Sequence, residues 1–245
     1  EFGWLMAAEL IAIGIDISFA PVVDLDLGLA EVIGDRALHE DAEVVASLAG
    51  AFIDGMQAAG MVGTAKHFPS HAGAHADSHT DIAVDRRDYS ELYDDLLPYR
   101  RLIAGGLHSV MVGHVAFPKL DELPASLSHW WIERQLRKEL GFAGAVISDD
   151  MNMAGAAAYG SPAERVQRAL DAGCDMVLLC NCPDAFDDVI NSLTGYSDPA
   201  AQLRVMRLRR RPGPDWESLR SSDRWQRAAR AVTELDMPPP LELKG

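Results

Sequence analysis

The 245-residue chain has few cysteines, few basic residues and no long apolar run. It contains only three cysteines, and an odd number at such close spacing argues against a disulfide framework and fits a reducing compartment. No second cysteine pair accompanies Cys180 and Cys182, so buried thiols are a better interpretation than a zinc site. No segment reaches the roughly 18 uninterrupted apolar residues of a membrane span, so no span is expected.

Basic residues are also scarce, with 22 Lys and Arg residues against 37 Asp and Glu residues and a formal net charge of −15. Nucleic acids and anionic membranes bind basic surfaces, so neither is expected as a partner. We interpret the dense basic run at 207–211 as the solvated end of a helix, because arginine side chains there complement the helix dipole.

Short apolar runs alternate with longer amphipathic stretches along most of the chain. Strands are predicted at 17–23, 62–66, 109–113, 145–148 and 176–180. Helices are predicted at 42–60, 89–104, 130–140, 163–172 and 185–193, and again near 199–210 and 216–235. Almost wholly apolar strands that alternate with helices predict a parallel sheet covered on both faces.

Polar residues follow nearly every predicted strand; in chain order they are Asp24 and Asp26, Lys66 and His67, His114, Asp149 and Asp150, and Asn181. A TIM-type barrel collects its active site at the carboxyl ends of many strands, whereas a doubly wound sheet uses one or two switch-point strands. We therefore expect an α/β fold of the (β/α)8 TIM-barrel type. Asp24 is expected to support the barrel wall, and His114 either lines the rim or caps a neighbouring carbonyl.

Only five strands can be located where a closed barrel needs eight, and the sequence opens at Glu1 inside a helical pattern without an N-cap. Each strand–helix unit takes about 30 residues, so we expect the first units of the barrel to be missing. Residues 1–245 are expected to form a single catalytic barrel domain, a fragment with C-terminal helices at about 198–236.

The segment 66–79 holds four of the eight histidines, at positions 67, 71, 75 and 79. On a helix this spacing would place them on one face as a metal site, but Pro69 and Gly73 favour a long loop. Asp77 stands two residues before His79 and can accept a hydrogen bond from one imidazole nitrogen, which leaves the other for proton transfer. No G-x-S-x-G nucleophile elbow is present, so a nucleophile must come from elsewhere.

Asp149 and Asp150 directly follow a predicted buried strand, where adjacent side chains point in different directions. One carboxylate can face the barrel mouth while the other caps the following helix or pairs with the wall. A carboxylate at the mouth suits covalent attack on the anomeric carbon of a sugar. Taken alone, however, metal binding or helix capping explains the pair about equally well.

Together these motifs resemble the bacterial β-N-acetylglucosaminidases of glycoside hydrolase family 3 that work in peptidoglycan recycling. The resemblance covers nearly the whole chain. It is carried by Lys66-His67-Phe68-Pro69, Asp77-Ser78-His79, Ser148-Asp149-Asp150-Met151-x-Met153, Ser18-Phe19-Ala20-Pro21-Val22-Val23-Asp24, Gly34-Asp35-Arg36, Phe52-Ile53-Asp54-Gly55-Met56 and Leu170-Asp171-Ala172-Gly173-Cys174-Asp175-Met176.

The resemblance implies a retaining glycosidase in the cytoplasm that releases terminal N-acetylglucosamine from anhydro-muropeptides. Asp149 aligns with the family's nucleophile, His79 with its acid/base and Asp77 with the dyad partner of that histidine. The residues that align with ligands of the sugar hydroxyls are Lys66, His67 and Arg36. The implied mechanism is double displacement. No metal or organic cofactor is implied.

Two departures from the family pattern affect these expectations. Ser70 and Ala72 stand where the family has glycine, and a side chain at a position that needs φ > 0 costs about 1 kcal/mol or more. The family also carries, before the point where this chain starts, two strand–helix units with an Asp-Gln-Glu-Gly-Gly motif. Without them the chain alone is expected to fold poorly or aggregate.

Three alternatives remain open. A metal-dependent hydrolase would use the four clustered histidines with Asp149. A β-N-acetylglucosaminide phosphorylase would share every catalytic residue, because a His–Asp dyad lacks the fixed negative charge that repels phosphate. A non-catalytic or vestigial sugar-binding protein is favoured by the absent units and the altered loop.

Overall fold

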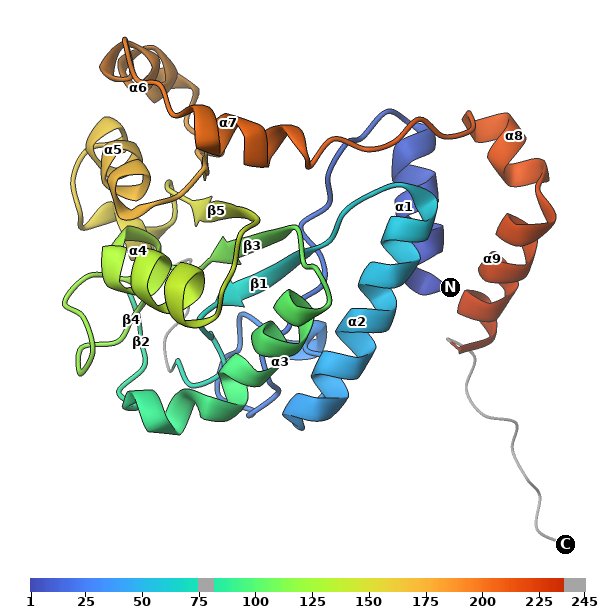
Figure 1. Cartoon of the computed structure of the whole chain (residues 1–245), viewed down its shortest axis with the longest axis horizontal. Helices are drawn as coiled ribbons and strands as arrows, with labels where there is room; N and C mark the ends of the chain where they lie inside the picture. Colours follow the sequence, from blue (N-terminus) through green and yellow to red (C-terminus); the bar gives the residue numbers. More distant parts are fainter. Residues whose placement is uncertain (75–81, 236–245) are drawn as a thin grey trace, which may run out of the picture.

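The computed structural model describes residues 1–74 and 82–235. Four parallel strands form the main sheet, and their order in the sheet is their order in the chain (Figure 1). They are β1 (Thr64–Phe68), β3 (Ser109–Val112), β5 (Ala145–Asp150) and β6 (Met176–Leu178). The prediction of a parallel α/β sheet is confirmed.

A further segment runs beside β1 at the position predicted for the first strand. Val23 N donates to Lys66 O at 2.8 Å, and Thr64 N donates to Ala20 O at 2.8 Å. Val22 forms a parallel bridge with Lys66, so the segment pairs with β1 without being a full strand. The order from this segment to β6 therefore contains no reversal within the described residues. A doubly wound sheet reverses at its switch point, so the arrangement is of the barrel type, although the described part is open.

Helices connect the strands and continue after β6. They are α1 (Phe2–Ala12), α2 (Ala42–Ala59), α3 (Tyr93–Ala104), the π-helix η4 (Trp130–Glu139), α4 (Ala154–Ala157), α5 (Pro162–Ala172), α6 (Phe186–Ser192), α7 (Pro199–Met206), α8 (Trp216–Ser221) and α9 (Asp223–Leu235). Single 3-10 turns lie at η1 (Gly34–Arg36), η2 (Tyr89–Leu92), η3 (Ala125–Leu127) and η5 (Pro183–Ala185). The two-residue strands β2 (Ala83–Val84) and β4 (Val115–Ala116) pair in parallel as a second small sheet.

Local sequence signals explain where these helices begin and end. Asp41 caps α2 by accepting from Glu43 N and Val44 N, and Ser161 forms a reciprocal capping box with Glu164 at α5. Gly60 and Gly173 end α2 and α5 in the left-handed conformation, with φ of 107° and 112°.

Several predicted details were wrong. Cys180 is exposed and Cys182 is half-buried, so these thiols are not the buried ones expected. The stretch 130–140 was expected to be an α-helix from its 3.6-type periodicity, but it forms a π-helix. Strand β1 continues through His67 to Phe68 instead of ending at Lys66. Asp149 and Asp150 are the last two residues of β5 and do not follow it. In the last two cases the strand continues because backbone pairing with β3 and β6 persists beyond the apolar run.

The two faces of the main sheet have different coverings. Val110, Val112 and Val146 belong to the large core that the sheet shares with α3, η4 and α5. Met111 and Ile147 point the other way, into a separate cluster that Leu208 covers at the end of α7. This period-two division is the one expected for a barrel wall, with helices outside and alternate residues inside.

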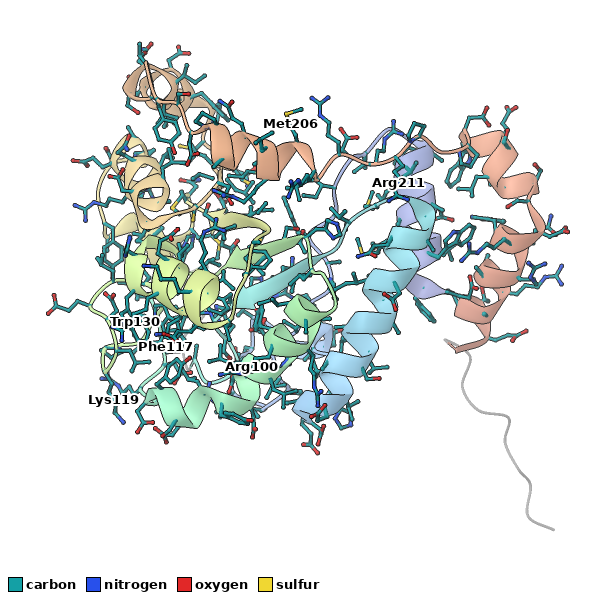
Figure 2. The ribbon with its side chains drawn as sticks, viewed as in Figure 1. Arg100, Phe117, Lys119, Trp130, Met206 and Arg211 are labelled. Atoms are coloured by element: carbon teal, nitrogen blue, oxygen red, sulfur yellow. The ribbon has the colours of Figure 1, made fainter. Side chains whose placement is uncertain are left out.

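Aromatic rings fill the core between the sheet and its helices. Phe68 of β1 packs edge-to-face on Tyr99 of α3 and on Trp131 of η4, with ring centroids 5.2 and 6.0 Å apart. Phe117 and Trp130 both pack on Trp131, with ring centroids 4.9 and 4.7 Å away, and lie close together in Figure 2. Because Phe68 lies one residue beyond His67, this cluster anchors the end of β1 from the outside.

The C-terminal helices lie within the range predicted for them. Helix α9 packs against α1, where Trp225 Nε1 donates to Glu9 Oε1 at 2.7 Å and the Arg224 guanidinium stacks over Trp4 at 4.1 Å. The connecting segment lies beside the end of α2, where Arg211 N donates to Gly60 O at 2.8 Å (Figure 2). Among the described residues, no helix combines the length and apolar character that crossing a membrane would require.

A buried carboxylate joins β6 to its neighbours at the end of the sheet opposite the predicted site. Asp175, 1% exposed in its side chain, accepts from Arg137 Nη2 and Val146 N through Oδ2, each at 2.8 Å. Its Oδ1 accepts from Arg204 Nε at 3.0 Å and from Arg204 Nη2 at 2.7 Å. One side chain thus connects η4, β5, β6 and α7.

We expect Asp175→Asn to destabilise the protein by about 3 kcal/mol, because it leaves two arginines without their shared carboxylate. For a domain of this size that corresponds to a fall in Tm of about 6–12 °C, measurable by differential scanning calorimetry. Asp184→Asn, at an exposed carboxyl, is the matched control and should leave Tm unchanged. A Tm for Asp175→Asn equal to that of the control would contradict the role given to this network.

Candidate active site

A β-bulge at the end of β1 aims two adjacent side chains at the same side of the sheet. Lys66 pairs with Met111, and Phe68 pairs with Val112, so His67 is an extra residue on β1. Without it, strict alternation would send Lys66 inward and His67 outward into the aromatic core. The bulge lets Phe68 occupy that core while Lys66 and His67 both face the inner side.

The buried carboxylate of Asp24 holds this irregular strand end in place. Its Oδ2 accepts from His67 N at 3.0 Å and from His67 Nδ1 at 2.8 Å, and its Oδ1 accepts from His71 N at 2.7 Å. Burial would raise the pKa of Asp24, but the neighbouring His67 and His71 outweigh it and the pKa lies below its usual value. Since an ionised carboxylate only accepts, Nδ1 of His67 carries the proton, and Nε2 is left as an acceptor.

The two adjacent aspartates at the end of β5 have different surroundings. Asp150 Oδ1 accepts from the backbone N–H groups of Asn152, at 2.9 Å, and Cys180, at 2.8 Å, so this carboxylate is part of the wall. Asp149 lies on the cavity side, where its Oδ1 accepts from Asp150 N at 2.8 Å. The sequence left open which aspartate would face the barrel mouth. The structure gives that position to Asp149 and the wall position to Asp150.

A cavity of about 120 Å³ brings the predicted residues together. Its lining residues are Val32, Ile33, Arg36, Lys66, His67, His71, Asp149 and Met153. Lys66, His67 and Asp149 lie at the carboxyl ends of β1 and β5, His71 and Met153 follow these strands, and the other three come from the segment that ends in η1. Of the site residues that the sequence analysis named, Asp149, Lys66, His67 and Arg36 therefore line one cavity at the carboxyl edge of the sheet.

The cavity holds groups of opposite charge close together, with the carboxylate of Asp149 near the ammonium group of Lys66. Burial would raise the pKa of Asp149, but His67, His114, the Asp150 N–H and Lys66 together place it below its usual value. Burial lowers the pKa of Lys66, and the carboxylate of Asp149 opposes that effect. Arg36 is exposed at the cavity edge and donates from Nη2 to Val32 O. The cavity thus presents one ionised carboxylate facing cationic and hydrogen-bonding groups, which suits attack on a carbon that develops positive charge.

Two predicted catalytic residues, Asp77 and His79, lie outside the described residues. Of the four clustered histidines, His67 and His71 are described, and their ring centroids lie 5.9 Å apart. Neither is on a helix, as the interpretation of the segment as a strand end and loop required. Within residues 1–74 and 82–235, no group of three or more His, Cys, Asp or Glu side chains is arranged to hold a metal ion.

The concern about strain at Ser70 and Ala72 does not apply, because neither residue has a positive φ. Instead the Ser70 hydroxyl donates to Asp95 Oδ1 and accepts from Ala72 N at 3.0 Å. Asp95 also accepts from Arg87 Nη1 at 2.8 Å. The side chain that replaces glycine therefore adds a hydrogen bond to a buried acidic group.

Sequence reasoning missed this ionic network beneath the histidine segment. Arg87 bridges the buried carboxylates of Asp85 and Asp95, at 2.7 and 2.8 Å. Gly73 packs so closely on it that a Cβ there would lie 2.4 Å from Asp85 Oδ2. His71 was noted only as one of four histidines, although it lines the cavity. The available signal for this network was Asp85 and Arg87 directly after a short apolar stretch, with Asp95 further along the chain.

Comparisons with known proteins agree with this geometry. Residues 1–210 match the family described as the glycosyl hydrolase family 3 N terminal domain. A beta-hexosaminidase from Thioalkalivibrio sulfidiphilus is 48% identical over 241 residues, which cover 98% of this chain and 70% of that protein. A beta-hexosaminidase from Nitrosospira multiformis is 49% identical over 216 residues, covering 88% of this chain and 62% of that protein. The chain thus spans about two thirds of the length of these relatives.

Solved structures show the same relationship. NagZ from Neisseria gonorrhoeae in complex with N-trifluoroacetyl-D-glucosamine is 36% identical with a TM-score of 0.88, over 96% of this chain and 68% of that one. A glycoside hydrolase family 3 beta-N-acetylglucosaminidase from Paenibacillus is 28% identical with a TM-score of 0.83, over 95% and 48% of the two chains. With a family match to residues 1–210 and relatives this similar, the chain belongs to glycoside hydrolase family 3.

Proposed function

We propose that the protein is a retaining β-N-acetylglucosaminidase that removes terminal β-linked N-acetylglucosamine by double displacement. The observation that carries the proposal is the ionised Asp149 carboxylate in a small cavity lined by Lys66, His67 and Arg36. The relatives named beta-hexosaminidase, and the Neisseria enzyme with its bound glucosamine derivative, support the same substrate class.

In the first step Asp149 attacks the anomeric carbon and forms a glycosyl-enzyme, while His79 protonates the leaving oxygen. In the second step His79 removes a proton from water, which releases the sugar with retained configuration. Asp77 is assigned to orient His79. The hydroxyl groups of the sugar are assigned to Lys66, His67 through Nε2, and Arg36.

The biological substrate is proposed to be a muropeptide in which N-acetylglucosamine is linked to an anhydro-muramic unit. On the resemblance to its family, we propose that the protein acts in peptidoglycan recycling in the cytoplasm. We also propose that residues 1–245 form one catalytic domain. The C-terminal helices α8 and α9 pack on α1 as well as on each other, which supports this proposal.

Asp149→Ala should lower kcat on an aryl β-N-acetylglucosaminide on the order of 10³-fold or more, because the covalent step loses its nucleophile. Added azide should restore turnover and yield the α-glycosyl azide, since a small anion can occupy the space of the missing carboxylate. Initial rates and NMR of the azide product provide the measurement. Asp171→Asn, at an exposed position, is the matched control; activity retained in Asp149→Ala would refute the assignment.

The depressed pKa of Asp149 predicts where the acid limb of kcat/KM lies. A carboxyl group whose pKa is below its usual value stays ionised until the pH falls below about 4, so nucleophile protonation should not slow the reaction at pH 5. A dinitrophenyl leaving group removes the need for acid assistance and isolates this limb. Lys66→Met should shift the limb to higher pH. An acid limb above about pH 5 in the wild type would contradict the prediction.

The phosphorylase alternative is separated by the product formed in phosphate buffer. We expect free N-acetylglucosamine, first as the β-anomer, in phosphate and in phosphate-free buffer alike, because the proposed second step is attack on the glycosyl-enzyme by water that His79 activates. Proton NMR of the reaction in progress distinguishes the anomers and any sugar 1-phosphate. Accumulation of the 1-phosphate would favour the phosphorylase, and inactivity of the wild type in both buffers would favour a binding protein.

A further inference from the structure

His114 is a buried histidine beside the site that the proposed mechanism does not use. It lies between β3 and β4 and is 1% exposed. Its Nδ1 is 2.6 Å from the hydroxyl of Ser126, which is itself completely buried in η3. Its Nε2 is 2.9 Å from the backbone carbonyl oxygen of Asp150. Both ring nitrogens therefore have partners on segments far apart in the chain.

The partners define the tautomer of this ring. A carbonyl oxygen only accepts, so the proton must be on Nε2. In the neutral ring Nδ1 then accepts from the Ser126 hydroxyl, and burial lowers the pKa of His114, which favours that neutral form. The ring is thus held at both ends in one orientation.

The carbonyl that His114 contacts belongs to the residue that orients the proposed nucleophile. Asp150 N donates to Asp149 Oδ1 at 2.8 Å. The Asp150 carbonyl also accepts from Met153 N at 3.0 Å, and its carboxylate accepts from Cys180 N at 2.8 Å. The backbone N–H, the carbonyl and the carboxylate of Asp150 are therefore all engaged, and His114 supplies a bond to the carbonyl from the segment that follows β3.

We propose that His114 is a positioning residue that fixes the backbone of Asp150, and through it the carboxylate of Asp149, for attack on the sugar. The inference rests on the proposed function, because it gives Asp149 the role of nucleophile. A hydrogen-bond chain runs from Ser126 through His114 and the Asp150 peptide groups to Asp149 Oδ1. Loss of the His114 bond leaves the carbonyl held by Met153 N alone, so residue 150 can rotate and turn the carboxylate of Asp149 away from its line of attack, while the sugar ligands Lys66, His67 and Arg36 stay in place.

The kinetic test compares His114→Ala with His114→Gln on an aryl β-N-acetylglucosaminide. Misplacing a reacting group by about 1 Å costs on the order of 10²-fold in rate, so His114→Ala should lower the rate of glycosyl-enzyme formation about 10- to 100-fold. KM should change less than kcat, because the sugar ligands are untouched. His114→Gln should recover most of the rate, since its side-chain N–H can reach the same carbonyl.

His108→Gln is the matched control, because this histidine precedes β3 at the opposite end of the strand and its side chain does not contact the cavity. It should keep wild-type kcat. A His114→Ala enzyme with unchanged kcat would overturn the inference while Asp149→Ala still tests the proposed function separately. A loss of activity that His114→Gln fails to recover, at a Tm equal to that of the wild type, would overturn it as well.

A second measurement does not require turnover. In ¹⁵N-labelled wild-type protein at pH 7, NMR should show His114 as the neutral tautomer with the proton on Nε2. A ring with its proton on Nδ1, or with protons on both nitrogens, could not make the two observed bonds in the stated sense and would overturn the inference even if the protein hydrolysed no glycoside.

Discussion

The site depends first on the buried carboxylate of Asp24. It accepts three hydrogen bonds, two from His67 and one from His71, and so joins the segment beside β1 to the bulged end of β1 and to the start of the histidine segment. A carboxylate buried this deeply is stable only because donors surround it. Any rearrangement of the strand end would leave that charge unpaired, so the bulge, the tautomer of His67 and the path of the chain to His71 are determined together.

Irregular backbone, more than regular structure, aims the reactive groups. The bulge turns His67 inward beside Lys66, and the end of β5 separates two adjacent aspartates into a cavity carboxylate and a wall carboxylate. In each case the neighbouring residue is fixed by its own contacts. Phe68 packs on aromatic rings of the core, and Asp150 is bonded within the wall. The regular sheet supplies rigidity, and local departures from its alternation supply direction.

The strands and helices were predictable because apolar runs, caps and glycine stops all mark the same boundaries, as at Gly60 and Gly173. The cavity residues were predictable in part, because Lys66 and Asp149 stand at strand ends and match family motifs. The bulge at His67 was not, since a single inserted residue leaves no trace in the apolar pattern. The bonds of Asp24 join residues 43 and 47 positions apart, and no local pattern carries such information. Ser70 was judged by the glycine that the family has at this position, whereas its hydroxyl bonds to Asp95, 25 residues away.

The electrostatics of the cavity favour a transition state more than a bound sugar. N-acetylglucosamine is neutral, so in the ground state Asp149 gains little from it and relies on Lys66, His67 and the Asp150 N–H to remain ionised. As the glycosidic bond breaks, positive charge develops at the anomeric carbon beside that carboxylate. The attraction is then new and acts where water is largely excluded, so it lowers the barrier without tightening binding of the substrate. If Asp149 is the nucleophile, as proposed, its orientation should affect rate more than affinity, because a carboxylate that points elsewhere no longer faces the developing charge.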